Sequence, residues 1–143
     1  QCAAALPHGA RPIVQAGRGA RILIVGQAPG SRVHASGMAW DDDSGDRLRG
    51  WLALDRETFY DPEQVALVPM GLCYPGKGNG GDLPRAMRPS LTAAVRAHAQ
   101  APQDRFPLPH PAWRSRLWMA RHPWFEAEVL PVLQAKVAQA LGR

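Results

Sequence analysis

Three short segments of the sequence hold residues whose types and spacing could do chemistry. The first is Leu108-Pro109-His110-Pro111, in which one histidine lies between two prolines. Proline fixes the backbone and has no N–H to give to a helix or sheet. A histidine held in this way has little part in a helix or sheet, which favours a functional role. The alternative is a purely structural histidine.

The second segment is an acidic run, Asp41-Asp42-Asp43, which directly follows Trp40. One of its carboxylates, Asp42 or Asp43, could orient a water molecule or stabilise a cationic intermediate. A solvated acidic turn before a helix, stabilised by the helix macrodipole, is the alternative. Trp40 could be an exposed platform on which a flat ligand stacks, or a core residue.

The third segment is Gly26-Gln27-Ala28-Pro29-Gly30, which follows the apolar run Arg21–Val25. Glycine lets the backbone approach a ligand closely, and proline fixes the turn. No Gly-Lys-Ser/Thr follows and no G-x-G-x-x-G is present, which excludes the two common phosphate-binding loops. The segment is either a pocket wall or an ordinary turn after a strand.

A basic and aromatic cluster follows His110 at once. Trp113 with Arg114 and Arg116 suits wedging at a DNA step and holding phosphates, although the arginines could also be solvated surface. The net charge is +5, and all the basic residues but Lys77 and Lys136 are arginine. This charge favours a polyanionic partner, but it is also typical of arginine-rich proteins from GC-biased genomes.

Strand and helix patterns alternate along the chain and must position these segments. Strands are predicted at Arg21–Val25, buried on both faces, at Val65–Val68, and at Phe106–Leu108. Helices are predicted after an N-cap at Ser44, over Leu91–Ala99, and from Pro123 with a kink or restart at Pro131. Leu48, Trp51 and Leu52 share a face of the first. This order predicts an α/β layer sandwich with a mainly parallel sheet. Ligands bind at the carboxyl ends of such strands, where both Gly26–Gly30 and His110 fall.

Length and composition favour one compact domain over residues 1–143, with 45% hydrophobic residues to build a core. We find no apolar run near the ~20 residues that span a bilayer, and no apolar leader at the N-terminus. Two cysteines, Cys2 and Cys73, form no disulfide framework. We therefore expect a cytoplasmic, monomeric protein without a membrane partner.

Together the three segments resemble those of the uracil-DNA glycosylase superfamily. Gly26–Gly30 resembles its first motif, and Gly37–Gly45 resembles the next segment, whose aromatic residue stacks on the flipped uracil. His110-Pro111-Ala112 resembles the second motif, whose histidine stabilises negative charge on uracil O2. The resemblance implies a three-layer α/β/α sandwich. It also implies hydrolysis of the N-glycosidic bond of uracil, or a related deaminated base, in DNA.

The resemblance assigns the candidate residues to three roles. The catalytic candidates are Asp42 or Asp43, and His110. Substrate contacts are expected from Gly26, Gln27, Ala28, Pro29, Gly30 and Trp40, and DNA contacts from Pro111, Trp113, Arg114 and Arg116.

Four departures from the family pattern leave alternatives open. Gln27 and Ala28 stand where relatives keep a carboxylate, and Pro69 stands where relatives carry the asparagine that reads uracil. The span Leu83–Ser90 is shorter than in the family. Cys2 and Cys73 resemble two of the four cluster cysteines, so we expect no cofactor in this chain; a longer parent protein could hold a four-iron four-sulfur cluster. The alternatives are a catalytically reduced module that binds uracil or abasic DNA, and an α/β enzyme acting on a free nucleotide or small acid.

Overall fold

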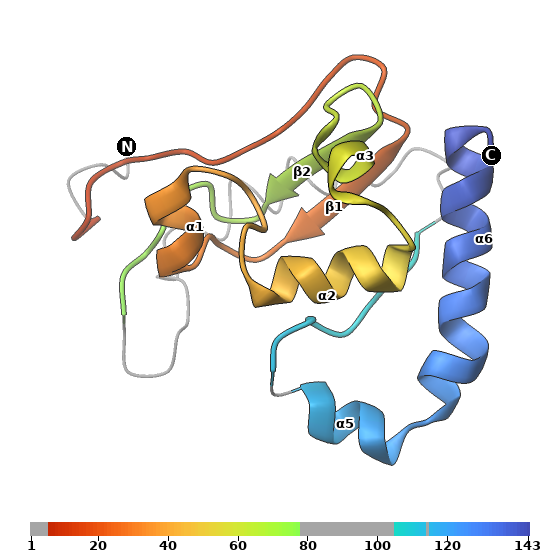
Figure 1. Ribbon diagram of the computed structural model, residues 1–143. Helices are drawn as coiled ribbons and strands as arrows, with labels where there is room; N and C mark the ends of the chain where they lie inside the picture. The colour runs from red at the N-terminus through yellow and green to blue at the C-terminus, as the bar shows by residue number, and fades with distance from the viewer. Residues whose placement is uncertain (1–5, 78–104, 114) are drawn as a thin grey trace.

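Two parallel strands form the centre of the computed structural model, which describes residues 6–77, 105–113 and 115–143 (Figure 1). Strand β1 (Ile22–Gly26) pairs with β2 (Val65–Pro69) in a register that runs from Ile22 opposite Val65 to Gly26 opposite Pro69. Two of the three predicted strands are thus confirmed, and they end at the same edge of the sheet. The fold is α/β, and the three-layer sandwich remains a prediction.

Strand β1 is covered on one face only, which corrects the prediction of a strand buried on both faces. Ile22 and Ile24 pack against the hydrophobic core, whereas Leu23 and Val25 are each 41% exposed. Successive side chains of a strand point to opposite faces, so an unbroken apolar run does not by itself show that both faces are covered.

An N-terminal segment borders β2 at the edge away from β1. The backbone N–H of Gln15 donates to the carbonyl of Leu67 at 3.0 Å, and the N–H of Leu67 returns a bond of 2.8 Å. The Gln15 side-chain amide also donates to the carbonyl of Val65, at 2.8 Å. The segment before β1 therefore helps to hold β2 in place.

Three helices lie between the strands: α1 (Ser31–Ser36), α2 (Asp43–Leu52) and α3 (Arg56–Tyr60). As predicted, Leu48, Trp51 and Leu52 of α2 are buried. The N-cap of α2 is Asp42 and not Ser44 as predicted, because an oxygen of Asp42 accepts the N–H of Gly45 at 2.9 Å. Ser44 already lies within the helix.

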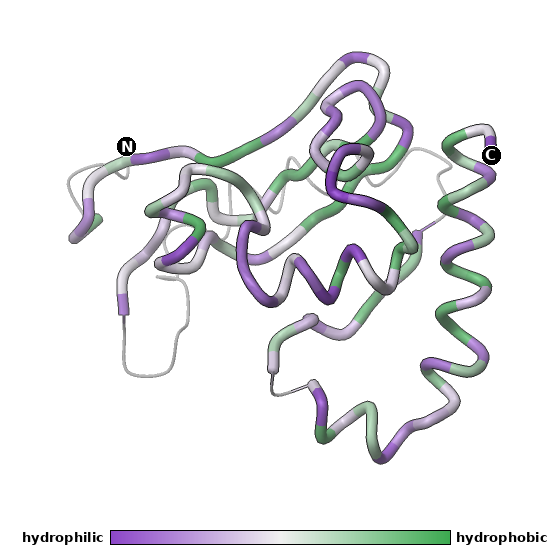
Figure 2. The backbone as a smooth tube through the Cα atoms, in the orientation of Figure 1, coloured by the Kyte–Doolittle hydropathy of each residue, from purple (hydrophilic) through white to green (hydrophobic). Residues whose placement is uncertain are grey.

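The C-terminal part consists of α5 (Ser115–Arg121), a π-helical turn η3 (Phe125–Val129) and α6 (Leu130–Leu141). Leu133 and Val137 of α6 are buried, and Phe125 meets Trp51 of α2 edge to face, with the ring centroids 5.1 Å apart. Polar and apolar residues alternate along α2 and α6, as expected for helices with one buried face (Figure 2). Pro131 lies in the first turn of α6, which confirms the predicted restart.

The strand predicted at Phe106–Leu108 is wrong, because residues 105–111 have no regular secondary structure. Pro107 and Pro109 lack the N–H that a strand gives to its neighbour, so this segment is a poor partner for a sheet. The predicted helix Leu91–Ala99 and the short span Leu83–Ser90 lie outside the described residues.

Two glycines of α2 test the packing at the start of this helix. A Cβ atom at Gly45 would lie 1.7 Å from the carbonyl oxygen of Trp40, whereas one at Gly50 would meet nothing within 4 Å. We expect Gly45→Ala to lower the free energy of unfolding by about 1–3 kcal/mol through overpacking. Gly50→Ala should raise it by about 0.5–1 kcal/mol, because alanine is the better helix former. Urea denaturation measures both, and equal effects would contradict the tight contact.

Candidate active site

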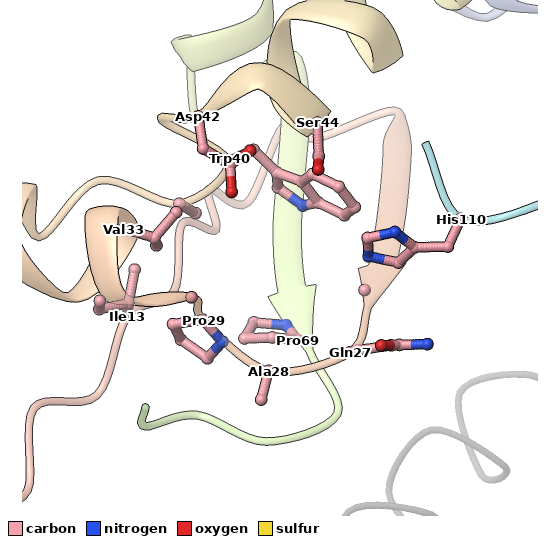
Figure 3. Close-up of a pocket in the computed structure, with 13 residues that line it drawn as sticks. Ile13, Gln27, Ala28, Pro29, Val33, Trp40, Asp42, Ser44, Pro69 and His110 are labelled. Carbon is pink, nitrogen blue, oxygen red and sulfur yellow. The ribbon is translucent and has the colours of Figure 1, made fainter. Parts of the chain in front are cut away.

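A cavity of about 210 Å³ opens at the carboxyl ends of β1 and β2 (Figure 3). Its walls come from six parts of the chain: the loop after β1, the start of α2, the end of β2, the segment around His110, the N-terminal segment and α1. The lining residues are Ile13, Gly26, Gln27, Ala28, Pro29, Gly30, Val33, Ala39, Trp40, Asp42, Ser44, Pro69 and His110. All six predicted substrate contacts lie on this surface.

The loop Gly26–Gly30 forms one wall of the cavity. Its backbone is held by the chain that follows β2, because the carbonyls of Gly26 and Gln27 accept the N–H groups of Met70 and Gly71 at 2.8 and 3.1 Å. Gly26 is needed for space, since a Cβ atom there would lie 2.7 Å from Cζ2 of Trp40. This loop offers no carboxylate, so acid chemistry must come from elsewhere.

Trp40 forms a second wall, with its indole ring packed against Gly26. Its ring centroid lies 5.9 Å from that of His110, with 30° between the planes. The backbone of Trp40 has a φ of +59°, in the left-handed region that residues other than glycine rarely adopt. Such a conformation costs on the order of 1–3 kcal/mol, and surrounding packing must maintain it.

The three aspartates of the acidic run have different surroundings. Asp41 pairs with Arg56 at 3.0 Å, and the hydrogen bond from this guanidinium holds the pKa of Asp41 below its usual value. Asp43 is exposed and pairs with Arg32 at 2.6 Å, outside the cavity lining. Only Asp42 lines the cavity, and Figure 3 shows it entering from the start of α2.

The carboxylate of Asp42 has one oxygen committed to the fold. Oδ1 accepts the N–H of Gly45 as the helix cap. Oδ2 would lie 3.9 Å from a Cβ atom on Gly30, so this oxygen faces the opposite wall. The structure therefore favours Asp42 over Asp43 as the carboxylate that could act on a bound ligand.

His110 points its imidazole toward Trp40 in the cavity (Figure 3). Desolvation by the surrounding atoms lowers the pKa of His110 below its usual value, and the negative charge of Asp42 partly opposes this shift. The lowered pKa favours the neutral imidazole, in which one ring N–H is available as a donor.

Side chains on either side hold the backbone around His110. Ser115 Oγ donates to the carbonyl of His110, and Arg47 donates to the carbonyls of Pro111 and Ala112. The sequence analysis did not single out Arg47. Its position three residues after Ser44, on an amphipathic helix beside the acidic run, is the signal that could have found it.

The predicted DNA contacts lie beyond the cavity. Pro111 is buried beside His110, Trp113 is 69% exposed, and Arg116 is exposed on the first turn of α5. Arg114 lies outside the described residues. The exposed side chains at Trp113 and Arg116 face solvent near the cavity, where a large ligand could reach them.

The cysteines do not fit a four-thiolate cluster by themselves. Cys73 is a buried free thiol, and Cys2 lies outside the described residues. A four-iron four-sulfur cluster is held by four cysteines, and this sequence has two. Among residues 6–77, 105–113 and 115–143, no group of three His, Cys, Asp or Glu side chains could hold a metal ion. The prediction about cofactors stays a prediction.

The cavity thus combines an aromatic wall, one carboxylate and one neutral imidazole in a small space. A family model, the uracil DNA glycosylase superfamily, matches residues 14–134. The chain belongs to the uracil-DNA glycosylase superfamily. The match includes every cavity residue except Ile13, and it confirms the family predicted from the motifs.

Members of the uracil-DNA glycosylase superfamily are typically glycosylases that act on DNA, which supports a glycosylase-like function here. Within the described part of the chain, no helix has both the length and the apolar character needed to cross a bilayer.

The coupling between Asp42 and His110 gives a direct test of the site geometry. The Asp42 charge favours the protonated imidazole, so Asp42→Asn should lower the pKa of His110 further. Asparagine is also a good N-cap, so α2 should persist. Asp43→Asn should leave this pKa unchanged, because Asp43 pairs with Arg32 outside the cavity. NMR titration of the His110 ring measures both, and equal shifts in the two variants would contradict the arrangement.

Proposed function

We propose that this protein is a DNA glycosylase that hydrolyses the N-glycosidic bond of uracil, or of a related deaminated base, in DNA. The observation that carries the proposal is the cavity in which Trp40, Asp42 and His110 meet at the carboxyl ends of the strands. Membership of the uracil-DNA glycosylase superfamily supports it.

The cavity suits a single flipped base. Its volume of about 210 Å³ is below the ~300–1,000 Å³ of pockets for drug-sized ligands. Enzymes that act on a base in DNA extrude the nucleotide into a small pocket and stack the base on aromatic or apolar side chains. Trp40 would provide such a surface, and the Gly26–Gly30 backbone would approach the base closely.

Asp42 would orient the attacking water and stabilise positive charge on the sugar. Its Oδ2 is the carboxylate oxygen that is not committed to the helix cap. Asp43 is less suited to this role, since Arg32 already neutralises it at the surface. General acid–base groups of this kind contribute typically about 10²–10⁴-fold to the rate.

His110 would stabilise the leaving base as an anion. A neutral imidazole has one ring N–H, which can donate a hydrogen bond to the oxygen of the leaving base as negative charge develops there. A preorganised donor of this kind is worth roughly 3–4 kcal/mol in oxyanion sites. The lowered pKa of His110 favours this neutral form.

DNA would lie over the surface around His110. Trp113, Arg114 and Arg116 are the residues we propose to contact it, with the arginines on phosphates and Trp113 as a wedge. Pro111, also predicted as a DNA contact, is buried and would instead hold the backbone of this segment. The net charge of +5 supports attraction to the strand.

A second candidate is a module that binds uracil or abasic DNA with little or no turnover. Gln27 and Ala28 supply no carboxylate, and Pro69 supplies no side-chain donor or acceptor to read the base edge. This candidate predicts binding that weakens steeply with salt, without product.

Incubation with a uracil-containing oligonucleotide, followed by alkaline cleavage at abasic sites, tests the proposal. We expect product from the wild-type protein and a loss of about 10²–10³-fold for His110→Ala. Asp42→Asn should lose about 10²–10⁴-fold, whereas Asp43→Asn should stay close to wild type because its carboxylate is outside the cavity.

Two outcomes would count against the proposal. Salt-dependent binding with no abasic product at high protein concentration would favour the binding module instead. Turnover that survives in His110→Ala would reject the proposed role of the imidazole.

A further inference from the structure

Arg47 joins helix α2 to the segment that carries His110. Its Nη1 donates to the carbonyl of Pro111 at 2.8 Å and to the carbonyl of Ala112 at 2.7 Å. Pro111 and Ala112 lie 64 and 65 positions after Arg47 in the sequence. Both bonds are charge-assisted and have the short lengths of strong hydrogen bonds.

The segment around His110 needs such support because its own backbone offers little. Residues 105–111 have no regular secondary structure, and Pro107, Pro109 and Pro111 have no N–H to donate. The carbonyl of His110 accepts from the Ser115 side chain, and the carbonyl of Pro111 accepts from Arg47. The carbonyl of Ala112 accepts from Arg47 and also from the backbone N–H of Ser115, at 3.0 Å. Where this segment lies thus depends on the side chains that reach it.

Helix α2 also carries the other chemical groups of the cavity. Asp42 caps it and Ser44 lines the cavity from its first turn. Arg47 lies three residues after Ser44, so the two are neighbours on one face of the helix. An α-helix is stiff and rises 1.5 Å per residue, so it sets the separation between the groups it carries.

We propose that Arg47 is a positioning residue, which sets where the His110 imidazole stands relative to Asp42 and Trp40. Arg47 itself does not line the cavity and acts through the backbone of Pro111 and Ala112. The position of the His110 ring is a property of the protein without DNA bound. Its kinetic consequence rests on the proposed glycosylase function.

The choice of arginine follows from the geometry of the two bonds. One planar guanidinium nitrogen serves both carbonyls, and the rigid group loses little freedom when it does so. Arg47→Lys keeps the charge on a flexible stem and should hold the segment only in part. Arg47→Met keeps much of the apolar stem and removes both bonds.

The first measurement is the NMR signal of the His110 ring, assigned by its absence in His110→Ala. Trp40, whose ring centroid is 5.9 Å away, should shift this signal in the wild-type protein through its ring current. In Arg47→Met the signal should move toward that of an unstructured histidine, with a smaller change in Arg47→Lys. Arg32→Met is the matched control, because it removes the same charge from a residue that pairs with Asp43 and does not touch this segment.

The second measurement is turnover of uracil-containing DNA. Arg47→Met should lower kcat on the order of 10²-fold, as small misplacements of catalytic groups do, with KM little changed. In the His110→Ala background the same substitution should have almost no further effect, since Arg47 acts through His110. Arg32→Met should leave kcat unchanged.

An unchanged His110 signal in folded Arg47→Met protein would overturn the proposal. So would a loss of kcat from Arg47→Met that is equal in the wild-type and His110→Ala backgrounds. If Arg47→Met fails to fold, the same two measurements are made on Arg47→Lys: the NMR signal of His110, and kcat with and without His110. If the wild-type protein has no turnover, the proposed function fails, and the NMR measurement still decides the role of Arg47.

Discussion

The tight turn at the start of α2 is the constraint on which the site depends. Asp42 caps the helix through the N–H of Gly45, and Gly45 in turn leaves room for the carbonyl of Trp40. This close contact holds Trp40 in a left-handed conformation, from which its indole reaches Gly26 at the end of β1. One local arrangement thus places both the carboxylate and the aromatic wall of the cavity.

The surroundings of the acidic run leave one aspartate at the cavity and place the other two in ion pairs outside it. Arg56 and Arg32 neutralise Asp41 and Asp43 at the surface, where such pairs contribute little to stability. Asp42 keeps an oxygen toward the cavity and acts on the charge state of His110. The pairing of the outer aspartates also reduces the negative charge that would repel a phosphate backbone near the cavity.

Much of the local structure could be predicted from the sequence. The apolar runs at β1 and β2, and the helical spacing of Leu48, Trp51 and Leu52, follow from side-chain periodicity alone. The errors arose where an element depends on its neighbours. Pattern alone does not show which face of β1 is covered, or that the proline-rich segment before His110 forms no strand.

The sequence by itself determined the family, the strands that end at the cavity, and the presence of a histidine between prolines. These follow from residue types and short-range order, which are properties of the local chain. Only the tertiary structure decided that Asp42 faces the cavity while Asp43 does not, and that Arg47 bonds to the carbonyls beside His110. Such choices depend on contacts between residues far apart in the chain, whose distances are set when α2 packs against the rest of the protein.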